Sequence, residues 1–314
     1  MNEPFLSTTD TRAIGALNRV LGSVEALRNG RALYLLLFAF TVAGMLLAFA
    51  DAALSRDSWP PAALCGGAAL TTLFYGSNAA GLVLMDEARG LASRPVGKAF
   101  RDALSIGHRL LLVLLTVLLG MTLLLATLAA LLWATRMPWV GPALFGLLLP
   151  AAVLVVGGAV LAGATVVAPL AAPAIWSGLS PRATLTLLAR HVRRRIVAVA
   201  LLNAAVGGLA ALVGALTTFV VMAGGRVVAA LAVLAAGVDV APALLMAGLF
   251  GHGLRSLGAA GGSAVASPHA QAALVGGGMV FMLALVLPAL VYLRGSCAVY
   301  LALEERESAA APLP

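Results

Sequence analysis

The sequence predicts an all-α integral membrane protein: a polytopic bundle of about six spans, with basic amphipathic helices at the membrane surface. Of its 314 residues, 62% are apolar and only 10% are charged, whereas soluble domains carry about 25% charged residues. The apolar residues form long runs, and about 20 such residues in a helix cross the hydrocarbon. Arginines gather between alternate runs, a pattern typical of proteins that cross the membrane repeatedly.

The net charge of +8 is carried almost entirely by arginine, because Lys98 is the single lysine. The arginines lie beside apolar runs, and no soluble basic domain is left to hold a nucleic acid. We therefore expect membrane lipids, chiefly anionic ones, as partners and no nucleic acid.

Three regions are expected along the chain. Residues 1–31 form an amphipathic N-terminal segment, 32–303 the transmembrane domain, and 304–314 a disordered tail. The predicted spans are 32–50, 62–85, 110–134, 143–176, 196–222 and 272–293. Within the first region Ile14, Leu17, Leu21 and Val24 recur at spacings of three and four, as on one face of a helix.

The fourth span is too long for one straight helix across the bilayer. It contains Pro150, Pro169 and Pro173, each of which removes a backbone N–H from a helix interior. The sequence therefore predicts kinks or an unwound end in this span.

Residues 180–195, SPRATLTLLARHVRRR, predict a basic helix at the membrane surface. Ser180 is a good N-cap and Pro181 fits the first turn. Leu185, Leu188 and Val192 share one face, and five arginines supply positive charge.

Residues 95–109 repeat this design before the third span. A helix-starting proline lies fourteen residues before the last arginine in both segments, and Val96, Phe100 and Leu104 share one face. Arg31 has the corresponding place before the first span. The pattern predicts a unit of one surface helix and one membrane hairpin, used three times.

Positive charges also predict the orientation. The N-terminal segment and the next four connecting segments contain four, one, five, one and five lysines and arginines. Segments rich in these residues stay in the cytoplasm. The N-terminus, 86–109 and 180–195 are therefore predicted to be cytoplasmic.

Residues 226–271 are predicted to form an insertion on the far side of the membrane. Residues 226–250 are apolar enough to cross, but Asp239, between Gly237 and Pro242, would be costly in mid-span. Six spans are favoured over seven on this ground, and both counts remain open.

Two sets of residues are candidates for function. The predicted lipid-headgroup set is Arg94, Lys98, Arg101, Arg109, Arg190, Arg193, Arg194 and Arg195. The predicted intramembrane polar set is Asn78, Asn203, Asp239 and Arg294. Asn78 and Asn203 lie at similar depths in the second and fifth spans, beside stripes of small residues that favour close helix packing. An arginine placed like Arg294 usually extends to the headgroups.

The sequence offers no catalytic grouping. His108, His191, His252 and His269 have no acidic or cysteine partners at ligand spacing, so no metal site is predicted. No cofactor motif occurs, and Cys65 and Cys297 are expected as free thiols.

Three stretches carry a family resemblance: FYGSNAAGLVLMDEARG at 74–90, VVAPLAAPAIWSGLSPRATLTLLARHVRRR at 166–195, and LPALVYLRGSCAVYLALEER at 287–306. The pattern resembles that of uncharacterised six-span bacterial inner-membrane proteins, themselves distantly similar to the membrane domain of some glycerophosphodiester phosphodiesterases. The resemblance implies a bacterial inner-membrane location. It implies no reaction, because this chain lacks the phosphodiesterase domain.

The sequence thus favours a non-enzymatic membrane scaffold or lipid-interacting protein. The alternative is a transporter or lipid carrier with a cavity near Asn78, Asn203 and Asp239. Oligomeric state and protein partners remain open.

Overall fold

The computed structural model describes residues 21–54, 56–137, 140–236 and 268–310, together with residues 15 and 18. Within these residues the secondary structure is helical, and six helical segments are long and apolar enough to cross a membrane. The predicted all-α fold is confirmed, and the protein is a multi-pass integral membrane protein. Asp239 lies outside the described residues, so the prediction of a far-side insertion is not tested.

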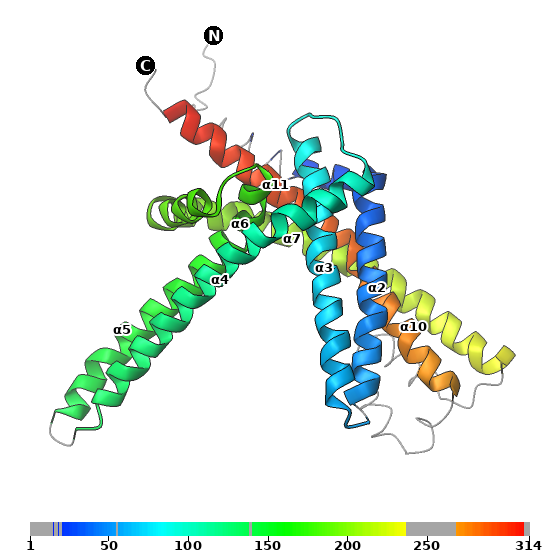
Figure 1. Cartoon of the computed structure of the whole chain (residues 1–314), viewed down its shortest axis with the longest axis horizontal. Coiled ribbons are helices and arrows are strands. Elements are labelled where there is room, and N and C mark those ends of the chain that lie inside the picture. The colour runs from blue at the N-terminus through cyan, green and yellow to red at the C-terminus, as the bar shows by residue number, and fades with distance from the viewer. Residues whose placement is uncertain are drawn as a thin grey trace, which may run out of the picture. The chain divides into compact units, whose positions relative to one another are not determined.

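The elements follow one another as predicted, with longer helices than the apolar runs alone (Figure 1). They are η1 (Gly22–Arg28), α2 (Gly30–Leu54), α3 (Trp59–Ala88), α4 (Val96–Ala134), α5 (Gly141–Ala162), the π-helical turn η2 (Gly163–Val167), α6 (Ala168–Trp176), α7 (Pro181–Ala236), α10 (Pro268–Ala284) and α11 (Val286–Ala310). The chain divides into two compact units. One contains residues 21–103 and 206–295, and the other contains 104–205 with 296 onward.

In the first of these units, α3 packs along α2 and α10 packs on α2 (Figure 1). Glycines make both contacts close. A Cβ added at Gly76 would lie 2.2 Å from the Cβ of Ala39, and one at Gly44 would lie 2.7 Å from the carbonyl oxygen of Gly278. Small residues are typical of such helix contacts in membranes, because they let the backbones approach closely.

Helices α7 and α11 meet in antiparallel fashion within the same unit. A Cβ on Gly295 would lie 2.5 Å from Val206, and one on Gly214 would lie 3.5 Å from Pro288. The small-residue stripe predicted on the fifth span runs through Asn203, Gly207, Ala211 and Ala215. Only Asn203 of these is buried, and a Cβ on Gly207 would meet nothing within 4 Å, so the predicted close packing is wrong beyond Asn203. The other buried residues of this part of the helix are Val206 and Ala210.

Helix α7 is bent where the predicted surface helix meets the fifth span. Arg195 has φ −142° and ψ 22°, values outside the helical region, while residues on both sides are helical. The Oγ of Ser180 accepts a hydrogen bond from the Ala183 N–H at 3.3 Å, as expected of an N-cap. The helix continues past Arg226 to Ala236, beyond the predicted end of the span.

A basic surface helix would expose His191, and a belt of aromatic residues at the membrane interface would expose Trp176 and Tyr300. All three are buried instead: His191 is 3% exposed, Trp176 7% and Tyr300 4%. The buried hydroxyl of Tyr300 has a hydrogen-bond partner in Ser177. The Ser177 hydroxyl donates to the Ala174 carbonyl oxygen at 2.7 Å, so it accepts the hydrogen bond from the Tyr300 hydroxyl at 2.9 Å. These side chains serve packing between helices.

The Gly76 contact leads to a first prediction. Gly76→Ala should lower the free energy of unfolding by about 1–3 kcal/mol, because the added methyl overlaps Ala39. Gly67→Ala is the matched control on the same helix, since a Cβ there meets nothing within 4 Å. Thermal unfolding in detergent would measure both variants, and equal midpoints would contradict the contact.

Candidate functional site

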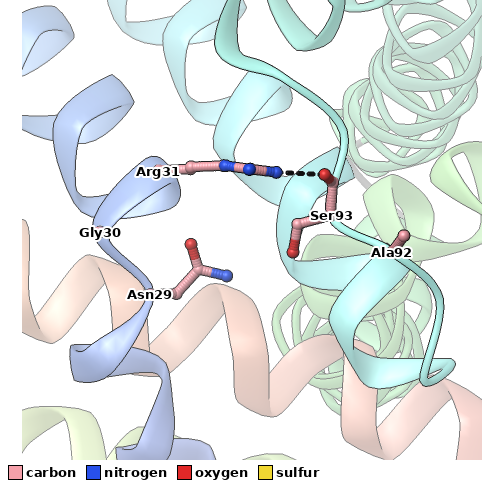
Figure 2. A pocket seen from close by; sticks show the side chains of 5 residues that line it. All are labelled: Asn29, Gly30, Arg31, Ala92 and Ser93. Carbon is pink, nitrogen blue, oxygen red and sulfur yellow. Dashed lines mark hydrogen bonds between the residues drawn. The ribbon is translucent and has the colours of Figure 1, made fainter.

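A polar groove lies where α2 begins (Figure 2). It has a volume of about 590 Å³ and is lined by Asn29, Gly30 and Arg31 from the start of α2, and by Ala92 and Ser93 from the loop between α3 and α4. We call it the Arg31 groove. A cavity of a few hundred Å³ is large enough for a small polar ligand.

Hydrogen bonds of Asn29 and Arg31 hold the two sides of this groove in place. The side-chain oxygen of Asn29 accepts a hydrogen bond from the Ala32 N–H at 3.0 Å, which caps α2. Its amide nitrogen donates to the carboxylate of Glu87 at the end of α3. The guanidinium of Arg31 extends across to the Ser93 carbonyl oxygen, to which it donates (Figure 2). The groove therefore presents one exposed cation among polar groups.

A three-member ion cluster fixes the adjoining loop. The guanidinium of Arg94 binds Asp86 through Nε and Nη2, at 2.6 and 2.7 Å, and Asp102 through Nη1 at 2.8 Å. The hydrogen bond to Asp86 raises the pKa of Arg94 above its ordinary value. The cluster links the end of α3 to α4, and it gives Arg94, one of the predicted headgroup residues, two carboxylate partners within the protein.

The other headgroup residues, with the exception of Arg195, lie on exposed helix faces. Thr184, Leu188 and His191 form the buried face of the first part of α7. The arginines on the opposite, exposed face are Arg182, Arg190, Arg193 and Arg194. Arg195, at the bend, is half-buried.

The first turns of α4 also have a buried face and exposed faces. Ala99 and Ala103 are buried, whereas Phe100 and Leu104 are 43% and 49% exposed. The predicted apolar face therefore points away from the protein, as a lipid-facing surface would. A separate exposed face holds the basic residues Lys98, Arg101 and Arg109.

Asn203 donates a hydrogen bond to a backbone carbonyl of the fourth span that a proline leaves without its helical donor. Pro169 has no N–H to offer the carbonyl four residues earlier, which belongs to Thr165. The chain forms the π-helical turn η2 there, and the amide of Asn203 donates to the Thr165 carbonyl oxygen at 2.7 Å. The predicted irregularity in this span is thus present as a π-helical turn, and Asn203 contributes to its stability.

Asn78 has a different partner. Its amide donates within its own helix, to the Phe74 carbonyl oxygen at 2.7 Å. The side chain is 4% exposed. The amide donors of Asn78 and Asn203 therefore bind two different backbone carbonyls, in separate units.

Asn29, Arg31 and Ser93 were absent from the sequence-based site. The repeat offered a signal for Arg31, because this residue has the place of Arg109 and Arg195 before an apolar run. Ser93 had none, since its approach to Arg31 depends on the fold of the α3–α4 loop. Among the residues that the structure describes, no group of three or more histidine, cysteine, aspartate or glutamate side chains is placed to hold a metal ion.

Comparisons with protein-family models, curated proteins and solved structures gave no match. The likeness to phosphodiesterase membrane domains thus remains a prediction from the sequence.

The ion cluster gives a second prediction. Arg94→Gln should lower the free energy of unfolding by about 1.5–3 kcal/mol, because Asp86 and Asp102 lose charge-assisted hydrogen bonds. Lys98→Gln, an exposed change four residues later, should leave it nearly unchanged. Chemical denaturation in detergent measures both, and equal losses would contradict the structural role of the cluster.

The hydrogen bond of Asn203 gives a third prediction. Asn203→Leu should lower the free energy of unfolding by about 1 kcal/mol, because the Thr165 carbonyl oxygen loses its donor. In a Pro169→Ala background the loss should be smaller, because an alanine N–H can serve the same carbonyl. A double-mutant cycle on thermal unfolding tests this, and strictly additive losses would show that Asn203 does not compensate for Pro169.

Proposed function

We propose that this chain is a non-enzymatic, lipid-interacting scaffold of a bacterial inner membrane, with its N-terminus and its arginine-rich segments in the cytoplasm. Its basic helix faces and the Arg31 groove bind the headgroups of anionic phospholipids.

The observation that carries the proposal is the exposed arginine face of α7. Arg190, Arg193 and Arg194 lie opposite a buried face, directly before the bend at Arg195 and the fifth span. Each such charge near an anionic membrane surface contributes about 1 kcal/mol of attraction. Because the other face of this helix is buried in the protein, the arginines are left to face the headgroups of the adjoining membrane.

The Arg31 groove supports the same function with a more selective geometry. A phosphate has oxygens to accept bonds from a guanidinium, and arginine is suited to bind it. Arg31 is exposed at the start of a span, the depth at which lipid phosphates lie. The carboxylate of Glu87, bonded to Asn29, limits the excess positive charge beside it.

A fourth prediction tests this function by stability in defined lipid. The protein in phosphatidylglycerol nanodiscs should unfold at a higher temperature than in phosphatidylcholine nanodiscs. The double variant Arg193→Gln/Arg194→Gln should lose much of this difference, about 1 kcal/mol for each arginine.

The matched control removes two arginines from the opposite, predicted periplasmic segments. Arg56→Gln/Arg136→Gln makes the same change in net charge and should keep more of the lipid dependence, because each of these arginines is an isolated charge outside the basic helix faces. Equal stability of the unmodified protein in both lipids, or equal losses in the two double variants, would refute the proposal.

A further inference from the structure

Arg294 lies deeper than its place at the end of the last apolar run suggests. The residues that follow it in α11 are uncharged and mostly buried, including Cys297, Val299 and Tyr300. The next charged residue is Glu304, ten residues further on. At 1.5 Å per residue this places Arg294 about 15 Å inside the charged end of the helix.

Packing against α7 gives the same depth independently. Gly295 is in contact with Val206, and Val206 lies eleven residues beyond Arg195, at the bend where the fifth span begins. The rise of a helix over eleven residues is about 16 Å. Both estimates place Arg294 near the centre of a hydrocarbon layer about 30 Å thick.

Arg294 has no counter-charge near it in sequence. Its Nε atom is enclosed and has no hydrogen-bond partner among the described residues, while the residue as a whole is part-exposed. Segments 206–236 and 268–295, which form the α7, α10 and α11 parts of this unit, contain no aspartate or glutamate. The acidic residues of the unit lie in segment 21–103 and at Asp239. A charged arginine in mid-membrane is costly unless it is paired or faces water.

Arginine at a span end normally avoids this cost by extending to the headgroups. Arg294 does not fit that description, because the side chain is much shorter than 15 Å and its Nε is enclosed. Binding of an anion to the guanidinium would offset this cost in the way that an ion pair does.

We propose that Arg294 anchors an intramembrane binding site for a phosphate group, which binds the two Nη atoms because Nε is enclosed. The planar guanidinium offers paired donors that match phosphate oxygens. The phosphate belongs to a phospholipid or to free inorganic phosphate. This site is separate from the surface arginines of the proposed function, and it provides a binding point at the depth where membrane carriers hold their substrates.

The test uses the full chain with Arg193→Gln/Arg194→Gln, so that surface binding is already weakened. This protein in dodecyl maltoside is titrated with dioleoyl phosphatidylglycerol, and native mass spectrometry gives the dissociation constant of the tightest lipid. Adding Arg294→Gln should weaken that site about tenfold or more, the loss expected for a charge-assisted hydrogen bond. Arg226→Gln, an exposed arginine on α7, is the matched control and should leave the constant unchanged.

A second arm distinguishes the source of the phosphate. Inorganic phosphate is added to the same variants in phosphatidylcholine nanodiscs, and thermal unfolding is measured. Stabilisation by phosphate that Arg294→Gln abolishes identifies a free-anion site. A lipid effect without a phosphate effect identifies a phospholipid site.

Arg294→Lys keeps the charge without the paired donors, and it carries the test if Arg294→Gln does not fold. It should bind more weakly than the parent protein. The proposal fails if Arg294→Gln and Arg294→Lys leave both the lipid and the phosphate responses unchanged. It also fails if Asp239→Asn in the parent protein creates a new anion response, because Asp239 would then be the partner of Arg294. Neither failure touches the lipid dependence assigned to Arg193 and Arg194.

Discussion

A polar group that enters the hydrocarbon of a bilayer must find its partner within the protein. The threonine hydroxyls in the spans follow this constraint, as when Thr72 donates to the Ala68 carbonyl and Thr217 to that of Val213. The Thr165 carbonyl is the demanding case, because Pro169 cannot serve it and another helix must. Asn203 supplies that donor, so the prolines of the fourth span and the asparagine of the fifth form one structural feature.

Charged groups also need partners within the protein, and an unpaired charge in hydrocarbon costs more free energy than an unpaired neutral group. Outside the spans, Arg94 forms ion pairs with Asp86 and Asp102, which connect α3 to α4. On the first part of α7, the arginines stay exposed and the helix turns Leu188 and His191 inward. Arg294 stands apart from both arrangements, because it combines mid-membrane depth with an enclosed donor. These three environments give one residue type a structural role, a proposed surface role and a proposed binding role.

Close packing of the spans depends on glycine. At Gly76 and Gly44 the neighbouring helix approaches to distances that no Cβ would tolerate. Such approach compensates for the weak hydrophobic drive between helices in lipid, since the lipid chains are as apolar as the side chains. Leucine-rich α4 contrasts with this design: Leu115 and Leu119 are exposed, as suits a lipid-facing helix.

The sequence by itself determined the helical fold, the order of the apolar helices among the described residues and the N-cap of α7. Each follows from local properties: the length of an apolar run, the spacing of charges and the hydrogen bond of Ser180 to the next turn. It also marked Asn203 and Arg294 as polar residues of interest. Only the tertiary structure decided what these side chains touch, because apolar periodicity does not tell a lipid-facing side from a protein-facing one in a membrane. Phe100 is exposed and His191 buried for this reason, and the Arg31 groove exists because the fold brings Ser93 to a residue 62 positions earlier in the chain.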